Sequence, residues 1–373
     1  MPTLSRADNS LLGRWWWTVD RCTLGAIGAL LGFGYIMILA SSPSVATRIG
    51  DPRYLLIYKQ VFFLVSAACV VVCVSMLTPR QVKRLAIAGC IIAIMLTAAT
   101  LVIGVEIKGA RRWIEFPGMA VQPSEFMKPC FAVVTAWLLA EAKRTPRFPG
   151  TLIALAIFAG IIMLLKEQPD VGMAAVVISV FLCQLYLAGM NLFLVLAGLG
   201  MMGGAGFLAY VIFPHVQARV HSFLHPTKND AYQATTALEA FGNGGFFGRG
   251  PGEGRVKDIL PDAHADFVFA VMGEEFGMLV CLVVIAVFTF IVLRVLLKLL
   301  KEPDLFTVLA CAGLVAGFGL EAFVNMASTL ALIPTKGMTL PFISYGGSSA
   351  IAVALGLGML LALTRRRHHG DAP

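Results

Sequence analysis

The chain has 373 residues, of which 58% are hydrophobic and 13% are charged, and its formal net charge is +8. Soluble domains carry about 25% charged residues, so this composition excludes an ordinary soluble protein and indicates an integral membrane protein. Nucleic-acid binding is a poor explanation of the positive charge, because the basic residues form no stripe on a soluble domain.

Ten apolar segments follow one another along the chain, and most approach the ~20 residues that a helix needs to cross a bilayer. Backbone polar groups in lipid must be hydrogen-bonded internally, and the alternation typical of a β-barrel is absent, so helices are predicted. The expected fold class is an all-α, polytopic bundle of about ten transmembrane helices. The segments span 22–42, 60–77, 85–104, 124–141, 150–165, 171–188, 190–213, 267–294, 304–331 and 346–364.

We interpret the chain as one membrane domain, 22–364, between an N-terminal segment, 1–21, and a basic tail, 365–373. If the N-terminus is cytoplasmic, the inner segments carry more Lys and Arg residues than the outer loops. The positive-inside rule then places both termini in the cytoplasm.

The largest break between apolar segments is 214–265, which precedes the eighth predicted helix and lies outside on this topology. A long loop of this kind is usually functional or disordered, and its aromatic residues, prolines and short apolar stretches indicate order. Its Gly-rich centre, 242–254, predicts a tightly turned loop that is free to approach a bulky ligand. A short helix is predicted at 230–241.

Two smaller outer loops carry basic residues. Lys108, Arg111 and Arg112 lie beside Trp113. This pattern suits an anionic phosphate at the bilayer surface, because Arg binds phosphate oxygens bidentately and Trp favours headgroup depth. Simple contact with lipid headgroups is an equally good interpretation. Lys336, in a loop bracketed by Gly and Pro, could reach a pyrophosphate in the same way.

Asp266 lies where the large loop meets the apolar segment 267–294. A carboxylate at this boundary could act as a general base that takes the proton of a hydroxyl nucleophile. The alternative is a helix N-cap, which satisfies free backbone N–H groups. Asp258 and Asp262 precede it at intervals of four, either as a solvated acidic turn or as part of an electronegative pocket able to hold a divalent cation.

Glu274 and Glu275 lie within the apolar segment itself. Two adjacent intramembrane acids are costly in hydrocarbon, so each must face a cavity or a partner. A helical step places Glu274 about 80° around from Asp266 and Glu275 about 180° around. Glu274 is therefore predicted to share the cavity of Asp266, and Glu275 to pair with a neighbouring helix through Lys128 or Asn325.

Glu125 and Lys128 lie near the start of the predicted helix 124–141. They are three residues apart, so their side chains meet on one helix face and are predicted to pair.

Seven short sequences, in this order, resemble the SEDS family (shape, elongation, division and sporulation proteins). One of them alone would be weak, whereas seven in order cover the chain from the first apolar segment to the last. They are 108–114 (KGARRWI), 122–129 (QPSEFMKP), 168–172 (QPDVG), 248–257 (GRGPGEGRVK), 260–270 (LPDAHADFVFA), 273–277 (GEEFG) and 340–349 (LPFISYGGSS).

The resemblance implies a ten-helix membrane enzyme, a peptidoglycan glycosyltransferase that polymerises lipid II outside the membrane. The family's essential acid falls on Asp266, where this chain has Ala265 in place of the family's usual Thr, which puts any hydroxyl role there in doubt. The residues expected to bind substrate are Lys108, Arg111, Arg112, Asp258, His264, Lys336, Ser344 and Tyr345, supported by Glu125, Lys128, Glu274 and Glu275.

Three further pieces, 236–242, 273–275 and 334–337, look more like the division members of the family than its elongation members. The implied partners are a class B penicillin-binding transpeptidase and other membrane proteins of the divisome. The implied location is the bacterial cytoplasmic membrane at the division septum. An elongation-type polymerase is the alternative within the family.

The expected reaction has Asp266 take the proton of the acceptor sugar's hydroxyl while undecaprenyl pyrophosphate leaves the donor. Arg111, Arg112 and Lys336 would offset the charge on the leaving group. No cofactor is certain, although a divalent cation (Mg²⁺ or Mn²⁺) could assist. A lipid II flippase would also need a polar cavity and intramembrane acids but no catalytic base. A scaffold in the divisome would need neither.

Overall fold

The computed structural model describes residues 10–49, 54–107, 110–116, 119–224, 232–260, 262–334 and 337–365. Each of the ten apolar segments coincides with a helix, so the prediction of a helical membrane bundle is confirmed. These helices are α2 (Arg21–Ile49), α3 (Leu55–Ser75), α4 (Pro79–Ile103), α5 (Pro123–Arg144), α6 (Gly150–Glu167), α7 (Val171–Leu187), α8 (Leu192–Ile212), α12 (Val268–Leu299), α13 (Leu305–Thr329) and α14 (Gly347–Leu363).

The helices differ in how well they suit a membrane. Within the described residues, seven are long and apolar enough to cross one: α2, α3, α4, α6, α8, α12 and α13. Two more, α7 and α14, are apolar but shorter. The α5 helix begins with Glu125 and Lys128 and ends with Lys143 and Arg144, which lowers its hydropathy. The chain is a multi-pass membrane protein.

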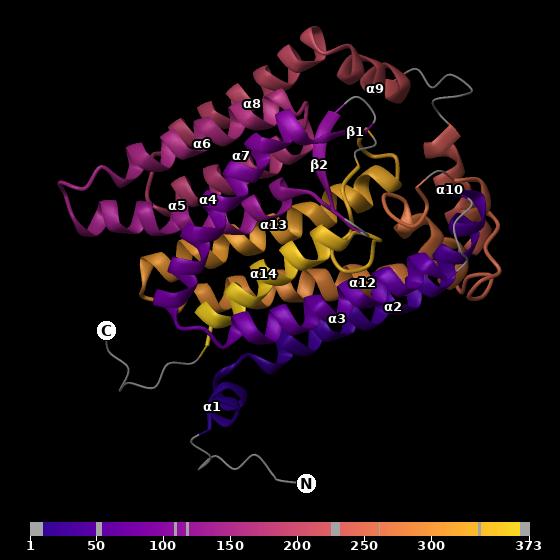
Figure 1. The fold of residues 1–373 in the computed structure, drawn as a ribbon, viewed down its shortest axis with the longest axis horizontal. Helices are drawn as coiled ribbons and strands as arrows, with labels where there is room; N and C mark the ends of the chain where they lie inside the picture. The colour runs from indigo at the N-terminus through magenta and orange to yellow at the C-terminus, as the bar shows by residue number, and fades with distance from the viewer. Residues whose placement is uncertain are drawn as a thin grey trace.

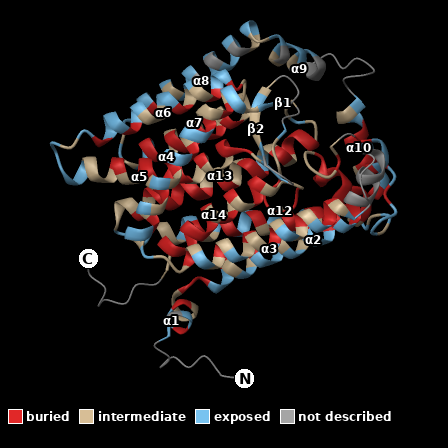
Figure 2. Ribbon diagram, in the orientation of Figure 1, coloured by how far each residue is buried: buried red, intermediate tan, exposed pale blue. Residues whose placement is uncertain are grey.

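The α5, α13 and α14 helices form the centre of the bundle. The α14 helix packs on α3 and α5, and α13 packs on α5 and α7. Buried residues gather along these elements, whereas α8 lies at the periphery and is largely exposed (Figures 1 and 2). In the spanning part of α13, 61% of residues are buried, against 7% in α8. The α13 helix is therefore a core helix, and it carries the fully buried Asn325.

One end of the bundle is held by charged residues around α1 (Leu11–Thr18). Arg294 donates to both carboxylate oxygens of Asp20, at 2.8 and 2.9 Å, and Lys298 lies 2.6 Å from Oδ2. Burial would raise the pKa of Asp20, but the hydrogen bonds from Arg294 and Lys298 outweigh it and hold that pKa below its ordinary value. Asp20 therefore joins the start of α2 to the end of α12 as an anion.

The opposite end contains a small antiparallel sheet that the all-α prediction missed. Its strands are β1 (Val105–Ile107), β2 (Ala110–Phe116) and β3 (Met119–Val121), in the order β1-β2-β3. Val105 pairs with Trp113, and Ile114 pairs with Val121. The β-branched and aromatic residues of β2 favour a strand, but a run this short is obscured by the long apolar segments around it.

The described part of the large loop contains helices, in agreement with the order that its composition predicts. It contains α9 (Pro214–Leu224), α10 (Tyr232–Gly244) and α11 (Val256–Ile259). The helix predicted at 230–241 is confirmed by α10, although the first two of those residues lie outside the described part of the chain. The α10 helix packs along α12, at the end of the bundle far from α1 (Figure 1).

Candidate active site

Asp266 lies in the turn that leads into α12. That helix begins at Val268, and its N-cap is Phe267, which makes no side-chain capping bond. Phe267 rather than Asp266 is therefore the N-cap, and the interpretation of Asp266 as the N-cap is wrong. The half-buried Asp266 side chain faces the segment that follows α13, because a Cβ atom added at Gly337 would lie 3.3 Å from its Oδ2.

Three consecutive carbonyl groups hold this turn in place. The Tyr345 N–H donates to His264 O at 2.8 Å, and the Ser344 hydroxyl donates to Ala265 O at 2.6 Å. Nδ2 of Asn325 then donates to Asp266 O at 3.0 Å. The segment after α13 and α13 itself thus fix the main chain at Asp266, and the tertiary structure brings 264–266 and 344–345 together.

His264 and Tyr345 also contact each other through their rings, whose centroids are 5.1 Å apart. The hydroxyl of Ser344 accepts from Leu340 N–H at 2.8 Å in addition to its donated bond, and the residue is buried. The structure therefore uses Ser344 to hold the turn, while a substrate contact by His264 and Tyr345 stays a prediction.

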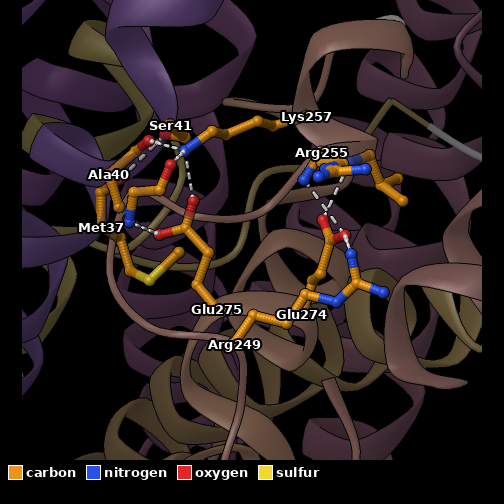
Figure 3. Close-up of polar contacts among 10 residues, drawn as sticks. Met37, Ala40, Ser41, Arg249, Arg255, Lys257, Glu274 and Glu275 are labelled. Carbon is orange, nitrogen blue, oxygen red and sulfur yellow. Dashed lines mark hydrogen bonds and ion pairs between the residues drawn. The ribbon is translucent and has the colours of Figure 1, made fainter. Parts of the chain in front are cut away.

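The two acids inside α12 are buried and bind the part of the large loop at 255–257, just after its Gly-rich centre (Figure 3). Glu274 accepts from the N–H groups of Arg255 and Val256 at 3.1 and 2.9 Å. Glu275 accepts from Lys257 at 2.6 Å, and Lys257 also donates to Ala40 O of α2 at 3.1 Å. We call Lys257, Glu274 and Glu275 the loop latch.

The latch corrects two predictions. Glu275 does pair with a cation, but its partner is Lys257 of the loop rather than Lys128 or Asn325. Glu274 directs its carboxylate at loop backbone N–H groups, so its role is to hold the loop that leads to Asp266. The sequence analysis did not single out Lys257 of α11, because nothing in the local sequence indicates that this lysine is buried.

The α12 helix is interrupted at Gly277, whose φ of +79° is a conformation that favours glycine. The break frees carbonyls and N–H groups that would otherwise bond within the helix, and the loop backbone takes their place. The replacement bonds run from Arg249 N to Glu274 O, from Gly250 N to Glu275 O, from Met278 N to Gly245 O and from Leu279 N to Phe246 O. A Cβ at Gly248 would lie 2.2 Å from Glu275 O, so this close approach requires glycine.

Glu125 and Lys128 form the predicted pair on α5, with Lys128 Nζ 2.7 Å from Glu125 Oε2. Lys128 also forms an ion pair with Glu321 of α13. The sequence analysis did not single out Glu321, although an acid within an apolar segment indicates a buried partner or a cavity. These three side chains line a mostly apolar pocket between α5, α7, α13 and α14.

A second pocket lies beside α7 and α13. Val176 lines both pockets, and the second is also lined by Val324 and Met338. Met338 follows Gly337, which is adjacent to the Asp266 carboxylate. We call this pair of pockets the α7–α13 groove. Asp266 itself lines neither pocket, and Met338 connects the groove to the segment that faces the carboxylate.

The basic residues have separate positions. Arg111 is exposed on β2 and lies 3.5 Å from the equally exposed Glu106. The guanidinium of Arg112 donates to Gln168 O and Pro169 O, at 2.9 and 2.7 Å. It also lies 3.1 Å from Asp170, so Arg112 fixes the α6–α7 turn in this structure. The predictions for Lys108 and Lys336 lie outside the described residues.

The acids near Asp266 do not form a metal centre in the described part of the chain. Asp258 lies in α11 and is exposed, and Asp262 lies in the turn with a φ of +52°. No three His, Cys, Asp or Glu side chains among the described residues gather closely enough to hold a metal ion. The described residues therefore offer no set of three protein ligands for a divalent cation, and a role for Mg²⁺ or Mn²⁺ stays a prediction.

This fold and this site define a class: a multi-pass helical membrane protein with a half-buried carboxylate in the turn that leads into one of its helices. The chain belongs to the FtsW/RodA/SpoVE family of cell cycle proteins, whose sequence model matches residues 21–369.

Curated relatives and solved structures agree with this assignment. The chain is 43% identical over 365 residues to the "Probable peptidoglycan glycosyltransferase FtsW" of Caulobacter vibrioides, covering 97% of this chain and 93% of the relative. It is 35% identical to the protein of the same name from Trichlorobacter lovleyi, covering 92% and 93%.

Two solved structures share the fold. A chain of a peptidoglycan synthase complex that coordinates polymerization and crosslinking matches with a TM-score of 0.76 at 25% identity, covering 93% of this chain and 97% of that one. Thermus thermophilus RodA, a rod shape determining protein, matches with a TM-score of 0.69 at 26% identity, covering 94% and 97%. The curated relatives are named FtsW and the second structure is named RodA, and the identity is higher to the FtsW proteins (43% and 35%) than to RodA (26%).

Proposed function

We propose that this chain polymerises lipid II into glycan strands at the outer face of the cytoplasmic membrane during septal wall synthesis. The glycosyltransferase class follows from its relatives, which are named as peptidoglycan glycosyltransferases. The observation that carries the finer proposal is the half-buried Asp266 carboxylate, which lies in the turn into α12 and faces Gly337. A substrate with a long apolar tail and a polar sugar head fits that arrangement.

In the proposed reaction, the Asp266 carboxylate accepts the proton of the acceptor sugar's hydroxyl. The resulting oxygen attacks the anomeric carbon of the donor, a new glycosidic bond forms, and the bond to undecaprenyl pyrophosphate breaks. One direct displacement inverts the anomeric carbon, so a single base suffices and no covalent nucleophile is needed. Arg111 and Lys336 offset the charge that develops on the leaving pyrophosphate.

A flippase and a scaffold are the rival functions. Both predict that the purified chain makes no glycan from lipid II. The deciding experiment incubates the purified chain with lipid II and a class B transpeptidase that lacks transferase activity of its own, and resolves the products by gel. Long glycan strands are expected. Transport of lipid II across vesicles without any polymer would favour the flippase instead.

The groove makes a separate prediction. Val324→Trp fills the pocket next to Met338 and is expected to raise the KM for lipid II by about tenfold with little change in kcat, because each CH₂ displaced from the groove costs about 0.8 kcal/mol. Val283→Trp is the matched control, since Val283 is exposed on α12 and lines neither pocket. Equal KM values for the two variants would refute a tail in the groove.

A class B penicillin-binding transpeptidase is the proposed partner, in the bacterial cytoplasmic membrane at the septum with both chain ends in the cytoplasm. The similarity to a complex that couples polymerization and crosslinking supports such a partner. The cluster of Asp20, Arg294 and Lys298 lies at the end opposite to Asp266, as the positive-inside rule requires if Asp266 is outside.

A further inference from the structure

Asn325 of α13 joins two segments of the site through a single amide group. The residue is fully buried. Its Nδ2 donates to Asp266 O at 3.0 Å and to Met338 O at 2.6 Å. Both N–H bonds of the amide are therefore used, one on the turn that carries Asp266 and the other on the segment facing it.

The bonds of Asn325 lie next to the carboxylate. Gly337 precedes Met338, and a Cβ at Gly337 would lie 3.3 Å from Asp266 Oδ2. An amide that fixes Asp266 O and Met338 O therefore also sets the gap between the carboxylate and the 337–338 backbone. An acceptor hydroxyl must enter this gap within hydrogen-bond reach of the base.

The other polar atom of Asn325 shows that stability alone does not explain this residue. Its Oδ1 is buried and accepts no hydrogen bond from any described residue. A buried acceptor without a donor costs free energy, and an apolar side chain of similar size would avoid that cost. Buried polar atoms without a hydrogen-bond partner are expected mainly at positions where function requires the residue.

We propose that Asn325 is the positioning residue for Asp266: it holds the base at a fixed distance from the opposing backbone without touching substrate. This inference rests on the proposed role of Asp266 as the base. A shift of about 1 Å in a catalytic group lowers rates by about 100-fold. Loss of the amide is therefore expected to act on kcat far more than on KM.

Gln184 provides a matched control far from the site. It is also a fully buried amide, and its Nε2 donates to two carbonyls on different helices, Ala132 O at 2.6 Å and Leu309 O at 3.1 Å. Gln184 lies near the end of α7, on the side of the bundle away from Asp266. Gln184→Leu removes the same number of donated bonds, together with one bond that Oε1 accepts from Thr135, and leaves the turn at 264–266 intact.

The experiment measures kcat, KM and thermal unfolding for Asn325→Leu, Asn325→Ser and Gln184→Leu in the purified chain with its transpeptidase, using lipid II. Both Asn325 variants are expected to lose about 100-fold in kcat per folded molecule, with KM within about threefold of wild type. Gln184→Leu is expected to unfold at a lower temperature while its kcat per folded molecule stays within about twofold of wild type.

Asp266→Asn, measured in parallel, separates this inference from the function on which it rests. If Asp266→Asn is inactive and either folded Asn325 variant keeps the wild-type kcat, the positioning role is refuted while the proposed base survives. If Asp266→Asn polymerises normally, the proposed base fails first. If Asn325→Leu does not fold, the kcat of Asn325→Ser tests the positioning role instead, because serine is smaller than asparagine and fits the same space. Equal kcat losses for the Asn325 and Gln184 variants would refute the positioning role, because they would show that Asn325 contributes only to the stability of the fold.

Discussion

Asp266→Asn is expected to lower the kcat of lipid II polymerisation by about 10²- to 10⁴-fold, which is the contribution typical of a general base. The amide keeps the size of the carboxylate but does not accept the acceptor sugar's proton at neutral pH. KM is expected to change little, because the groove proposed to bind the apolar tail is untouched. Initial rates of glycan formation over a range of lipid II concentrations measure both constants.

Two further variants sharpen this result. Asp266→Glu keeps the charge but moves the carboxylate by one CH₂ towards Gly337, so about 100-fold of the rate is expected to be lost through misplacement. Asp304→Asn is the control, because Asp304 caps α13 at the other end of the bundle and Asn caps helices equally well. A wild-type rate for Asp266→Asn would end the proposal that this residue is the base.

Lys257→Met is expected to destabilise the folded protein by about 3–5 kcal/mol, because it leaves the buried Glu275 carboxylate without its cation. The carboxylate would keep only the N–H of Gly252, which donates at 2.9 Å. The melting temperature in detergent is expected to fall by roughly 10 °C. The polymerisation rate should fall with it, since the latch holds the loop that leads to Asp266.

The double variant Lys257→Met with Glu275→Leu tests the physical cause. Replacing both members of a buried ion pair with apolar residues is often neutral or stabilising, so much of the lost melting temperature is expected to return. The exposed pair of Arg111 and Glu106 is the comparison, and Arg111→Met is expected to cost only about 0–1 kcal/mol. A double variant no more stable than Lys257→Met alone would show that the charge imbalance is not the cause.

Hydropathy and the spacing of residues along single helices were sufficient to predict the membrane helices and one ion pair of this protein. Apolar runs long enough to cross a bilayer located the ten helices, because the membrane itself imposes their length. The pairing of Glu125 with Lys128 also followed from sequence, because residues three apart on one helix meet wherever the helix lies. The boundary position of Asp266 was visible for the same reason: it is a property of the local sequence.

The tertiary structure alone decided which groups those residues meet. Lys257 reaches Ala40, 217 residues away, and Asn325 reaches Asp266, 59 residues away, and neither contact leaves a periodic trace in the sequence. The break at Gly277 depends on a loop backbone supplying the bonds that the helix gives up. By itself, then, the sequence determined a multi-pass helical bundle with an acid at the edge of its eighth apolar segment. Only the packing of distant segments decided what holds that acid in place, because buried polar groups take whichever partner the fold brings within about 3 Å.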